Sequence, residues 1–300
     1  MKLVIRADDF GFTRVLNDGL LKAVENGVVT TIDIMLDTPG FEDAAERMKQ
    51  YPWISTGWHT HFYWKPVLPP EQVSSLLDPE TGRFKNGLTR SDDVDEDEVI
   101  AECRAEVERC IRIMGKAPDT TDLNDTSVFE KARKKVCDEY GIIYHFAEKH
   151  MKTDHILSEV KDGKQLQETM AIGPSEKYKH LDIYFPTDIH SLKYVHQDSA
   201  EEFTKYDPVQ YYIDDPDNMK AHKISVMPWH PGYTDEFIFR IYDNPLFNSI
   251  RSRDIEALCS DRMKQWIREN HVELVNYRDA IFGTKEYQNH LKAIGSDLAI

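Results

Sequence analysis

The chain has 300 residues, 40% hydrophobic and 11% aromatic, enough to build a sizeable core in one large domain or two small ones. Its formal net charge of −16 argues against nucleic acid and anionic membranes as partners, because an acidic surface repels phosphate groups. No stretch approaches the ~20 apolar residues of a membrane-spanning helix.

The N-terminal segment and the cysteines indicate where the protein is located. The N-terminus is expected to be a strand and not a signal peptide. The four cysteines lie in helix-like segments without C-x-x-C spacing, so we expect reduced thiols of a cytoplasmic protein. They are Cys103, Cys110, Cys137 and Cys259.

Strand-like and helix-like segments alternate along the chain. In order, we expect strand 2–7, helix 13–27, strand 30–36, helix 41–51, strand 54–62, helix 95–115, helix 130–141, strand 142–146, strand 223–230, helix 253–270 and strand 272–277. The helix over 95–115 has the strongest pattern, with acids at its N-terminus and one apolar stripe. This order predicts an α/β fold with a parallel sheet, open or closed into a barrel.

Two segments interrupt the alternation. Residues 63–95 contain several prolines and predict a long loop. Residues 147–218 are polar and lack periodicity, and we interpret them as a large insertion or lid over one end of the sheet. The chain is therefore expected to be a single domain over 1–300 that carries this insertion.

Polar side chains follow the strands of the predicted sheet, where loops of parallel α/β folds build their sites. Carboxylate and imidazole groups that converge at one sheet edge suit a divalent metal ion with open positions, as metal-assisted hydrolysis requires. These residues are Asp8, Asp9, His59, His61, Asp122, Asn124, Asp125 and His230.

Each of these features also has an interpretation without a metal. The pair Asp8 and Asp9 could cap the next helix, and the two histidines of H-x-H at 59–61 could be hydrogen-bonded core residues. His230 before Pro-Gly could be a turn residue. The chain has no glycine-rich phosphate loop, G-x-S-x-G or H-E-x-x-H, so no other known motif competes.

The sequence resembles the YdjC-like carbohydrate deacetylases. The matching motifs are ADDFG at 7–11, GWH at 57–59, SLLDPETGRF at 75–84, WHPGYTDE at 229–236 and LVNYRD at 274–279, in that order. The resemblance implies a distorted (β/α) barrel of the polysaccharide-deacetylase type. It also implies a homodimer that hydrolyses the acetamide of N-acetylated sugars with one divalent ion, namely Zn, Mg, Mn or Co.

The resemblance assigns roles to four residues. Asp9 and His59 would be metal ligands, and Asp8 would be the general base that activates water. His230 would protonate the leaving amine or stabilise the oxyanion. A base and an ion together are needed because both acetamide and neutral water react poorly.

The chain departs from the family pattern at the third metal ligand. The family has a histidine-rich run after K-x-P, whereas this sequence reads DLNDTSV at 122–128, which puts Asn124 at the ligand position. Four outcomes stay open. Asn124 ligates through its amide oxygen, Asp125 or Asp122 replaces it, His61 substitutes from the third strand, or the metal site is lost.

Aromatic residues flank the predicted ligands and could stack on sugar rings or pack the barrel rim. The candidates for substrate binding are Trp58, His61, Tyr63 and Trp229. The expected function is a metal-dependent deacetylase of an N-acetylated sugar or oligosaccharide. The rival hypotheses are a catalytically silent saccharide-binding relative and a metal hydrolase that acts on a different amide or an ester.

Overall fold

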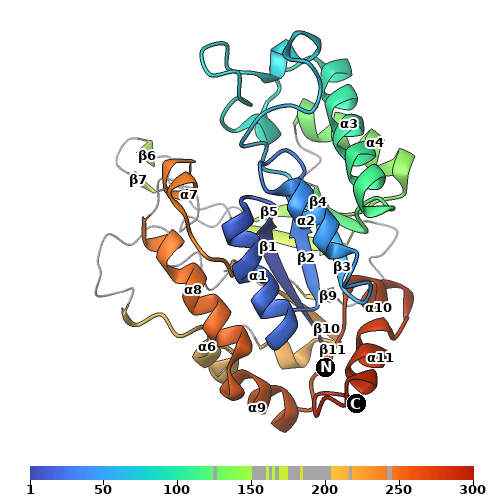
Figure 1. The fold of residues 1–300 in the computed structure, drawn as a ribbon, viewed down its shortest axis with the longest axis vertical. Helices are drawn as coiled ribbons and strands as arrows, with labels where there is room; N and C mark the ends of the chain where they lie inside the picture. Colours follow the sequence, from blue (N-terminus) through green and yellow to red (C-terminus); the bar gives the residue numbers. More distant parts are fainter. Residues whose placement is uncertain are drawn as a thin grey trace.

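The computed structural model describes residues 1–123, 127–150, 160–161, 164–165, 169–174, 183–184, 204–215, 218–241 and 245–300. In this part of the chain, a mostly parallel sheet is flanked by helices (Figure 1). The strand order is β8-β5-β4-β3-β2-β1-β10-β9, and β11 also pairs with β1. Within the described residues β8 and β9 do not pair with each other, so the barrel is incomplete. The prediction of a distorted α/β barrel is confirmed.

All strand pairs of this sheet are parallel except that of β5 with β8. The strands are β1 (Lys2–Phe10), β2 (Thr31–Ile34), β3 (Ser55–Trp58), β4 (Thr120–Leu123), β5 (Ile143–His150), β8 (Thr169–Pro174), β9 (Ile183–Tyr184), β10 (Ile224–Trp229) and β11 (Glu273–Leu274). Apart from this sheet, two short strands pair antiparallel, β6 (Val160–Lys161) and β7 (Lys164–Gln165).

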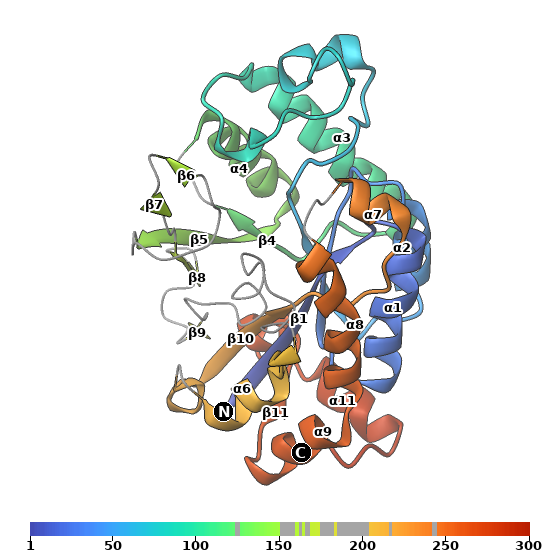
Figure 2. The same ribbon diagram turned by 90° about the vertical axis from the view of Figure 1, so that its left-hand side faces the viewer.

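Helices α1, α2 and α8 cover one side of the sheet (Figure 2). Helices α3 and α4 and the segment 63–95 form a lobe at the end opposite the two chain termini (Figure 1). The helices are α1 (Arg14–Asn26), α2 (Phe41–Met48), α3 (Glu96–Met114), α4 (Val128–Tyr140), α6 (Pro208–Asp214), α7 (Glu236–Ile241), α8 (Pro245–Cys259), α9 (Asp261–Glu269), α10 (Tyr277–Phe282) and α11 (Glu286–Ala293).

The ends of α3 follow from local chemistry. The side chain of Asp95 accepts hydrogen bonds from the backbone N–H groups of Asp97 and Glu98, which satisfies donors that the first helical turn leaves free. Gly115 then adopts a left-handed φ of 82° and ends the helix, a conformation that costs glycine little. The predicted helix over 95–115 is therefore confirmed.

Three predicted elements differ from the structure for reasons that local contacts or strand pairing make clear. The single helix predicted over 253–270 is two helices, because the Ser260 hydroxyl accepts a hydrogen bond from Met263 N and starts α9. The strand predicted over 272–277 shrinks to β11, since Asn276 forms a capping box that starts α10. The strand predicted over 54–62 ends at Trp58.

The segment 63–95 contains only short 3-10 turns, namely η1 (Pro70–Gln72), η2 (Ser74–Leu76) and η3 (Leu88–Arg90). Most of the insertion predicted over 147–218 lies outside the described residues. All four cysteines are free thiols, and Cys103, Cys110 and Cys137 are buried. Among the described helices, none has the length and apolar character required to span a membrane.

Candidate active site

The carboxyl end of β1 carries two buried acids, Asp8 and Asp9. Successive side chains of a regular strand point to opposite faces. Here the pairing of β1 with β2 shifts register between Ala7 and Phe10, and Asp9 has a left-handed φ of 70°. Both acids consequently reach one imidazole, since Asp8 and Asp9 each have a carboxylate oxygen within 4.8 Å of a nitrogen of His59.

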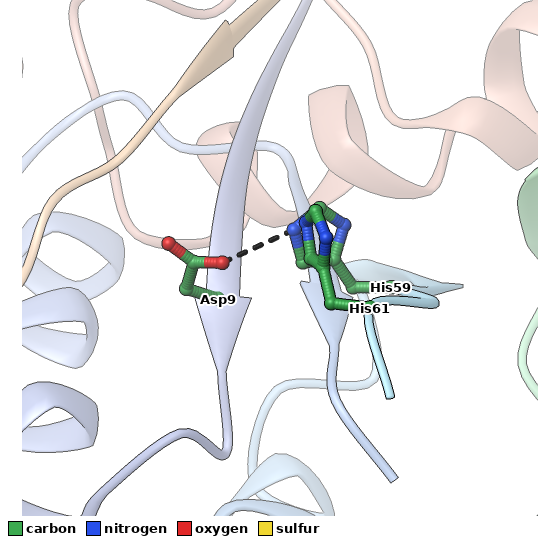
Figure 3. Close-up of side chains that lie close together, drawn as sticks. All are labelled: Asp9, His59 and His61. Atoms are coloured by element: carbon green, nitrogen blue, oxygen red, sulfur yellow. Dashed lines mark ion pairs between the residues drawn. The ribbon is translucent and has the colours of Figure 1, made fainter. Parts of the chain in front are cut away.

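His59 and His61 lie in the loop after β3. The backbone N–H of His59 donates to the Ile34 carbonyl at 2.8 Å, which fixes the start of this loop against β2. Nε2 of His59 lies 3.1 Å from Oδ1 of Asp9 (Figure 3). The His61 ring meets the His59 ring edge-on at 4.2 Å between centroids. The three potential ligand atoms of Asp9, His59 and His61 all lie within 4.8 Å of one another.

Asp8 is held by Arg6, a buried cation two residues earlier on the same strand. Nε of Arg6 lies 2.8 Å from Oδ1 of Asp8, and Nη2 lies 2.9 Å from Oδ2. The remaining nitrogen, Nη1, contacts Asp122 Oδ2 at 2.8 Å and Asp33 Oδ2 at 3.4 Å. Sequence reasoning missed Arg6, although its i, i+2 spacing from Asp8 was a signal that the two share a strand face.

Asp33 on β2 is a second residue that the sequence did not single out. It is buried, and its carboxylate lies against Gly57 of β3, where an added Cβ would be 2.0 Å from Oδ1. Gly57 therefore makes room for this acid. Asp122, considered as a metal ligand from the sequence, accepts a hydrogen bond from Arg6. Asn124 and Asp125 lie outside the described residues.

His230 follows β10 on the other side of β1. Its Nε2 lies 3.9 Å from Oδ2 of Asp8, and its ring packs edge-on against Phe247 at 4.9 Å. Its backbone N–H donates to Oδ2 of Asp254 on α8 at 3.0 Å. Helix α8 also supplies Arg251, whose Nη2 lies 2.7 Å from Oδ2 of Asp9. No local pattern links Arg251 to Asp9, since the two residues are 242 positions apart along the chain.

Burial and pairing shift the pKa values of these groups in different directions. Burial raises the pKa of Asp8 despite Arg6, and raises that of Asp33 to about 7. Burial also opposes ionisation of Asp9, but Arg251 and His59 bring its pKa well below the usual value. The pKa of His59 rises to about 9, because its acidic neighbours outweigh burial. Burial lowers the pKa of His230 well below the usual value.

Two predicted substrate-binding residues lie in the core. The indoles of Trp58 and Trp229 are almost fully buried. The Trp58 N–H donates to Glu106 at 3.2 Å, and the Trp229 N–H donates to the Tyr212 hydroxyl at 2.7 Å. Neither indole offers a ring face to a substrate, so this interpretation of the two residues is corrected. Their strands place both side chains toward helices that the sequence alone could not position.

The other predicted aromatic group lies at the rim. Tyr63 is partly exposed and stacks on His61 with 4.9 Å between centroids and a 4° interplanar angle. Next to it, Trp64 meets Phe237 of α7 at 4.8 Å. Both of these rings are also partly exposed. The loop after β3 and helix α7, which follows β10, thus contribute one aromatic rim beside the histidines.

A row of glutamates on α3 supports the loop that carries the histidines. Glu98 accepts from Ser75 N at 2.7 Å. Glu102 accepts from the backbone N–H groups of Val67 and Leu68 at 2.6 and 3.1 Å. Glu106 accepts from the Trp58 indole. Glu102 and Glu106 are buried at the spacing of the apolar stripe of α3, and this spacing is the signal that sequence reasoning missed.

Comparison with known proteins agrees with the fold. The structure superimposes on the crystal structure of a protein described as a cellobiose-phosphate cleavage protein from Enterococcus faecalis. The TM-score is 0.65 at 22% identity, and the match covers 93% of this chain and 98% of that one. At this identity the likeness concerns the fold alone.

Sequence relatives cover nearly the whole chain. "Carbohydrate deacetylase 2" of Listeria innocua is 27% identical over 288 residues, which are 93% of this chain and 98% of the relative. "Chitooligosaccharide deacetylase" of Proteus mirabilis is 24% identical, with the same coverage of 93% and 98%. The sequence model of the family described as YdjC-like protein matches residues 2–269. The chain belongs to the YdjC-like family.

Proposed function

We propose that the protein is a metal-dependent hydrolase that removes the acetyl group from an N-acetylated sugar or oligosaccharide. The observation that carries this proposal is the meeting of Asp9, His59 and His61 around one point, beside the second acid Asp8. The relatives named as deacetylases of carbohydrates and chitooligosaccharides support the substrate class and the reaction.

The donor atoms fit a divalent ion. Nε2 of His59 is buried and, although close to Asp9, has no partner with hydrogen-bond geometry among the described residues. Its unshared electron pair can therefore serve an ion once the ring has lost its proton. Two imidazoles and one carboxylate are a donor set found in catalytic zinc sites. When bound, such an ion would polarise the acetyl carbonyl and lower the pKa of water.

Geometry favours His61 as the third ligand. Its imidazole lies against that of His59, whereas Asp122 is engaged by Arg6. Asp8, Asp33 and His59 also have ligand atoms within 4.8 Å of one another. However, Arg6 contacts both oxygens of Asp8 and one of Asp33, so a guanidinium already supplies positive charge on that side. The ion would therefore be held on the Asp9 side of His59.

Asp8 is the proposed general base. Its raised pKa makes it a better proton acceptor than an ordinary carboxylate, and Arg6 fixes its orientation. The proton of the attacking water moves to Asp8, and the nucleophilic oxygen bonds to the acetyl carbon. The products are acetic acid, which ionises to acetate and a proton, and the free amine.

His230 is the proposed donor of a proton to the departing nitrogen. Its lowered pKa keeps the resting ring neutral at neutral pH, so it must first receive the proton that it delivers. Oδ2 of Asp8, 3.9 Å from Nε2, belongs to the carboxylate that has just gained one. The route from water to Asp8, then to His230 and to the amine, balances the protons of amide hydrolysis.

The aromatic rim is the proposed sugar contact. Tyr63, Trp64 and Phe237 present partly exposed rings next to the histidines. Flat apolar ring faces match the C–H faces of pyranose rings, and polar edges remain for hydroxyl groups.

The test measures acetate release from small N-acetylglucosamine oligomers before and after chelation, and after addition of Zn, Mn, Co or Mg. We expect chelation to abolish release and at least one ion to restore it. Asp8→Asn, Asp9→Asn and His59→Gln should each lower kcat/KM by about 100-fold or more. The matched control is Asp261→Asn at an exposed carboxylate of α9, which should leave release unchanged.

Three results would redirect the proposal. Acetate release that persists fully in chelator would show that the reaction needs no metal ion. Saccharide binding without hydrolysis, unaffected by chelator and by Asp9→Asn, identifies a silent binding protein. Metal-dependent hydrolysis of O-acetyl esters or of other amides, without action on N-acetyl sugars, identifies a hydrolase of a different class.

A further inference from the structure

Arg251 is a buried cation that touches the proposed metal-binding carboxylate from outside the ligand set. Its side chain is 1% exposed, and Nη2 lies 2.7 Å from Oδ2 of Asp9. Its guanidinium carbon lies 4.8 Å from the centroid of the Phe247 ring. Nε and Nη1 are buried and have no hydrogen-bond partner among the described residues. The hydrogen bond to Asp9 is thus a principal polar interaction of this guanidinium. Arg6 differs, because its guanidinium contacts the carboxylates of Asp8, Asp33 and Asp122.

The two acids at the end of β1 are therefore contacted differently. Arg6 contacts both oxygens of Asp8. Arg251 contacts one oxygen of Asp9, and the other oxygen faces His59. An ion held by Asp9 and His59 would bind Oδ1 of Asp9, while Oδ2 of Asp9 stays bound to the Arg251 guanidinium. This arrangement favours one-oxygen ligation over two-oxygen ligation.

The positive charge of Arg251 acts against a bound cation. A buried guanidinium next to a carboxylate offsets part of the negative charge that the carboxylate offers to an ion, and it repels the ion directly. Replacing it with a neutral side chain would leave His59 as the remaining cationic neighbour of the buried Asp9 carboxylate, which would then gain more from a bound cation.

We propose that Arg251 is a positioning residue that lowers the affinity of the site for its divalent ion. It does so by fixing Asp9 through Oδ2 and neutralising part of its charge, which leaves the ion more electron-poor and a stronger Lewis acid. The inference rests on the proposed function, because it requires that an ion bind at Asp9 and His59.

The direction of the effect separates this role from a structural one. If Arg251 only kept Asp9 in place, a neutral variant would lose order at the site and bind the ion more weakly. If Arg251 lowers affinity through its charge, the neutral variant binds the ion more tightly. Activity is not needed to distinguish the two outcomes.

The experiment titrates the metal-free, full-length protein with Zn²⁺ and Co²⁺ at pH 7.5 against a chromophoric chelator. Arg251→Gln and Arg251→Met should each bind the ion at least tenfold more tightly than wild type. Arg251→Lys, which keeps the charge, should stay within about threefold of wild type. The Co²⁺ absorption spectrum of the neutral variants should also change, since Asp9 becomes free to offer its second oxygen.

Thermal unfolding provides a second measurement of ion binding, which also applies to variants of low stability. An ion that binds only the folded state raises Tm according to its concentration relative to Kd. The rise in Tm on adding Zn²⁺ should therefore be larger for Arg251→Gln than for wild type, even if the metal-free variant melts earlier.

The outcomes distinguish this inference from the proposed function. Equal or weaker ion binding by both neutral variants, with normal binding by wild type, overturns the role of Arg251 alone. A wild-type protein that binds neither ion overturns the proposed metal site and this inference together.

Discussion

Replacement of Arg6 tests the electrostatic arrangement at the end of β1. The residue is 3% exposed, contacts Asp8 through two nitrogens, and reaches Asp33 and Asp122 through the third. Arg6→Met keeps an unbranched apolar stem but removes the cation. Removing one partner of a buried ion pair costs about 3–5 kcal/mol of unfolding free energy. Because three carboxylates share this cation, we expect Arg6→Met to lower the unfolding free energy by about 5 kcal/mol at pH 8.

The loss of unfolding free energy in Arg6→Met should be larger at high pH than at low pH. Without Arg6, burial raises the folded-state pKa values of Asp8 and Asp33 further above their unfolded values. An acid whose pKa is raised on folding contributes stability below its unfolded pKa, and this contribution is lost as the pH rises through the folded pKa. The variant therefore suffers most at pH 8 and recovers as its carboxylates take up protons. At pH 5.5 we expect the penalty to fall below about 3 kcal/mol.

The assay is urea unfolding followed by tryptophan fluorescence at pH 8 and pH 5.5, in the presence of chelator. The double variant Arg6→Met/Asp33→Asn should regain about 1 kcal/mol or more at pH 8, since it removes one uncompensated carboxylate. The control, Arg47→Met, breaks a partly exposed pair with Asp18 and should cost less than about 1 kcal/mol at both pH values. A penalty for Arg6→Met below 1 kcal/mol, or one that is equal at both pH values, would refute the reasoning.

The remaining predictions concern the neighbouring groups. Gly57→Ala should cost about 1–3 kcal/mol in urea unfolding, because the new Cβ would lie 2.0 Å from Asp33 Oδ1, and Asp33→Ser should relieve it; a neutral single variant contradicts the clash. Glu102→Ala leaves two backbone N–H groups without their buried acceptor, so it should lower the unfolding free energy by about 2–5 kcal/mol and raise KM. The control Glu139→Ala, on the exposed face of α4, should do neither. A Glu102→Ala variant as stable as wild type would count against the anchoring role. Burial raises the pKa of Asp37 to about 6 and that of Asp254 to about 7, so the unfolding free energy of the metal-free protein should decrease from pH 5 to pH 8. Asp254→Asn should flatten this decrease by about 2 kcal/mol in the same melts, and an unaltered slope would show that Asp254 does not titrate there.

The sequence by itself determined the order of elements and the edge at which polar side chains gather. Two acids after the first strand, H-x-H after the third and a histidine after a late strand predict one site, since parallel strands end at the same edge of the sheet. Asp8, Asp9, His59, His61 and His230 do lie together there. Hydrophobic periodicity and capping residues are local signals, so they carry this information without knowledge of the fold.

Only the tertiary structure decided how the charges pair and which rings stay accessible. The contact of Arg251 with Asp9 joins residues 242 positions apart, and no local pattern specifies such a pair. The register shift at Asp9 depends on how β1 meets β2, and it turns adjacent acids toward one imidazole. Trp58 and Trp229 look like ligand-binding rings beside the histidines, yet both are buried in the core. Trp58 contacts α3 and α4, and Trp229 contacts α6. Burial and ion pairing depend on which distant elements pack together, and that is settled by the complete core and not by any one segment.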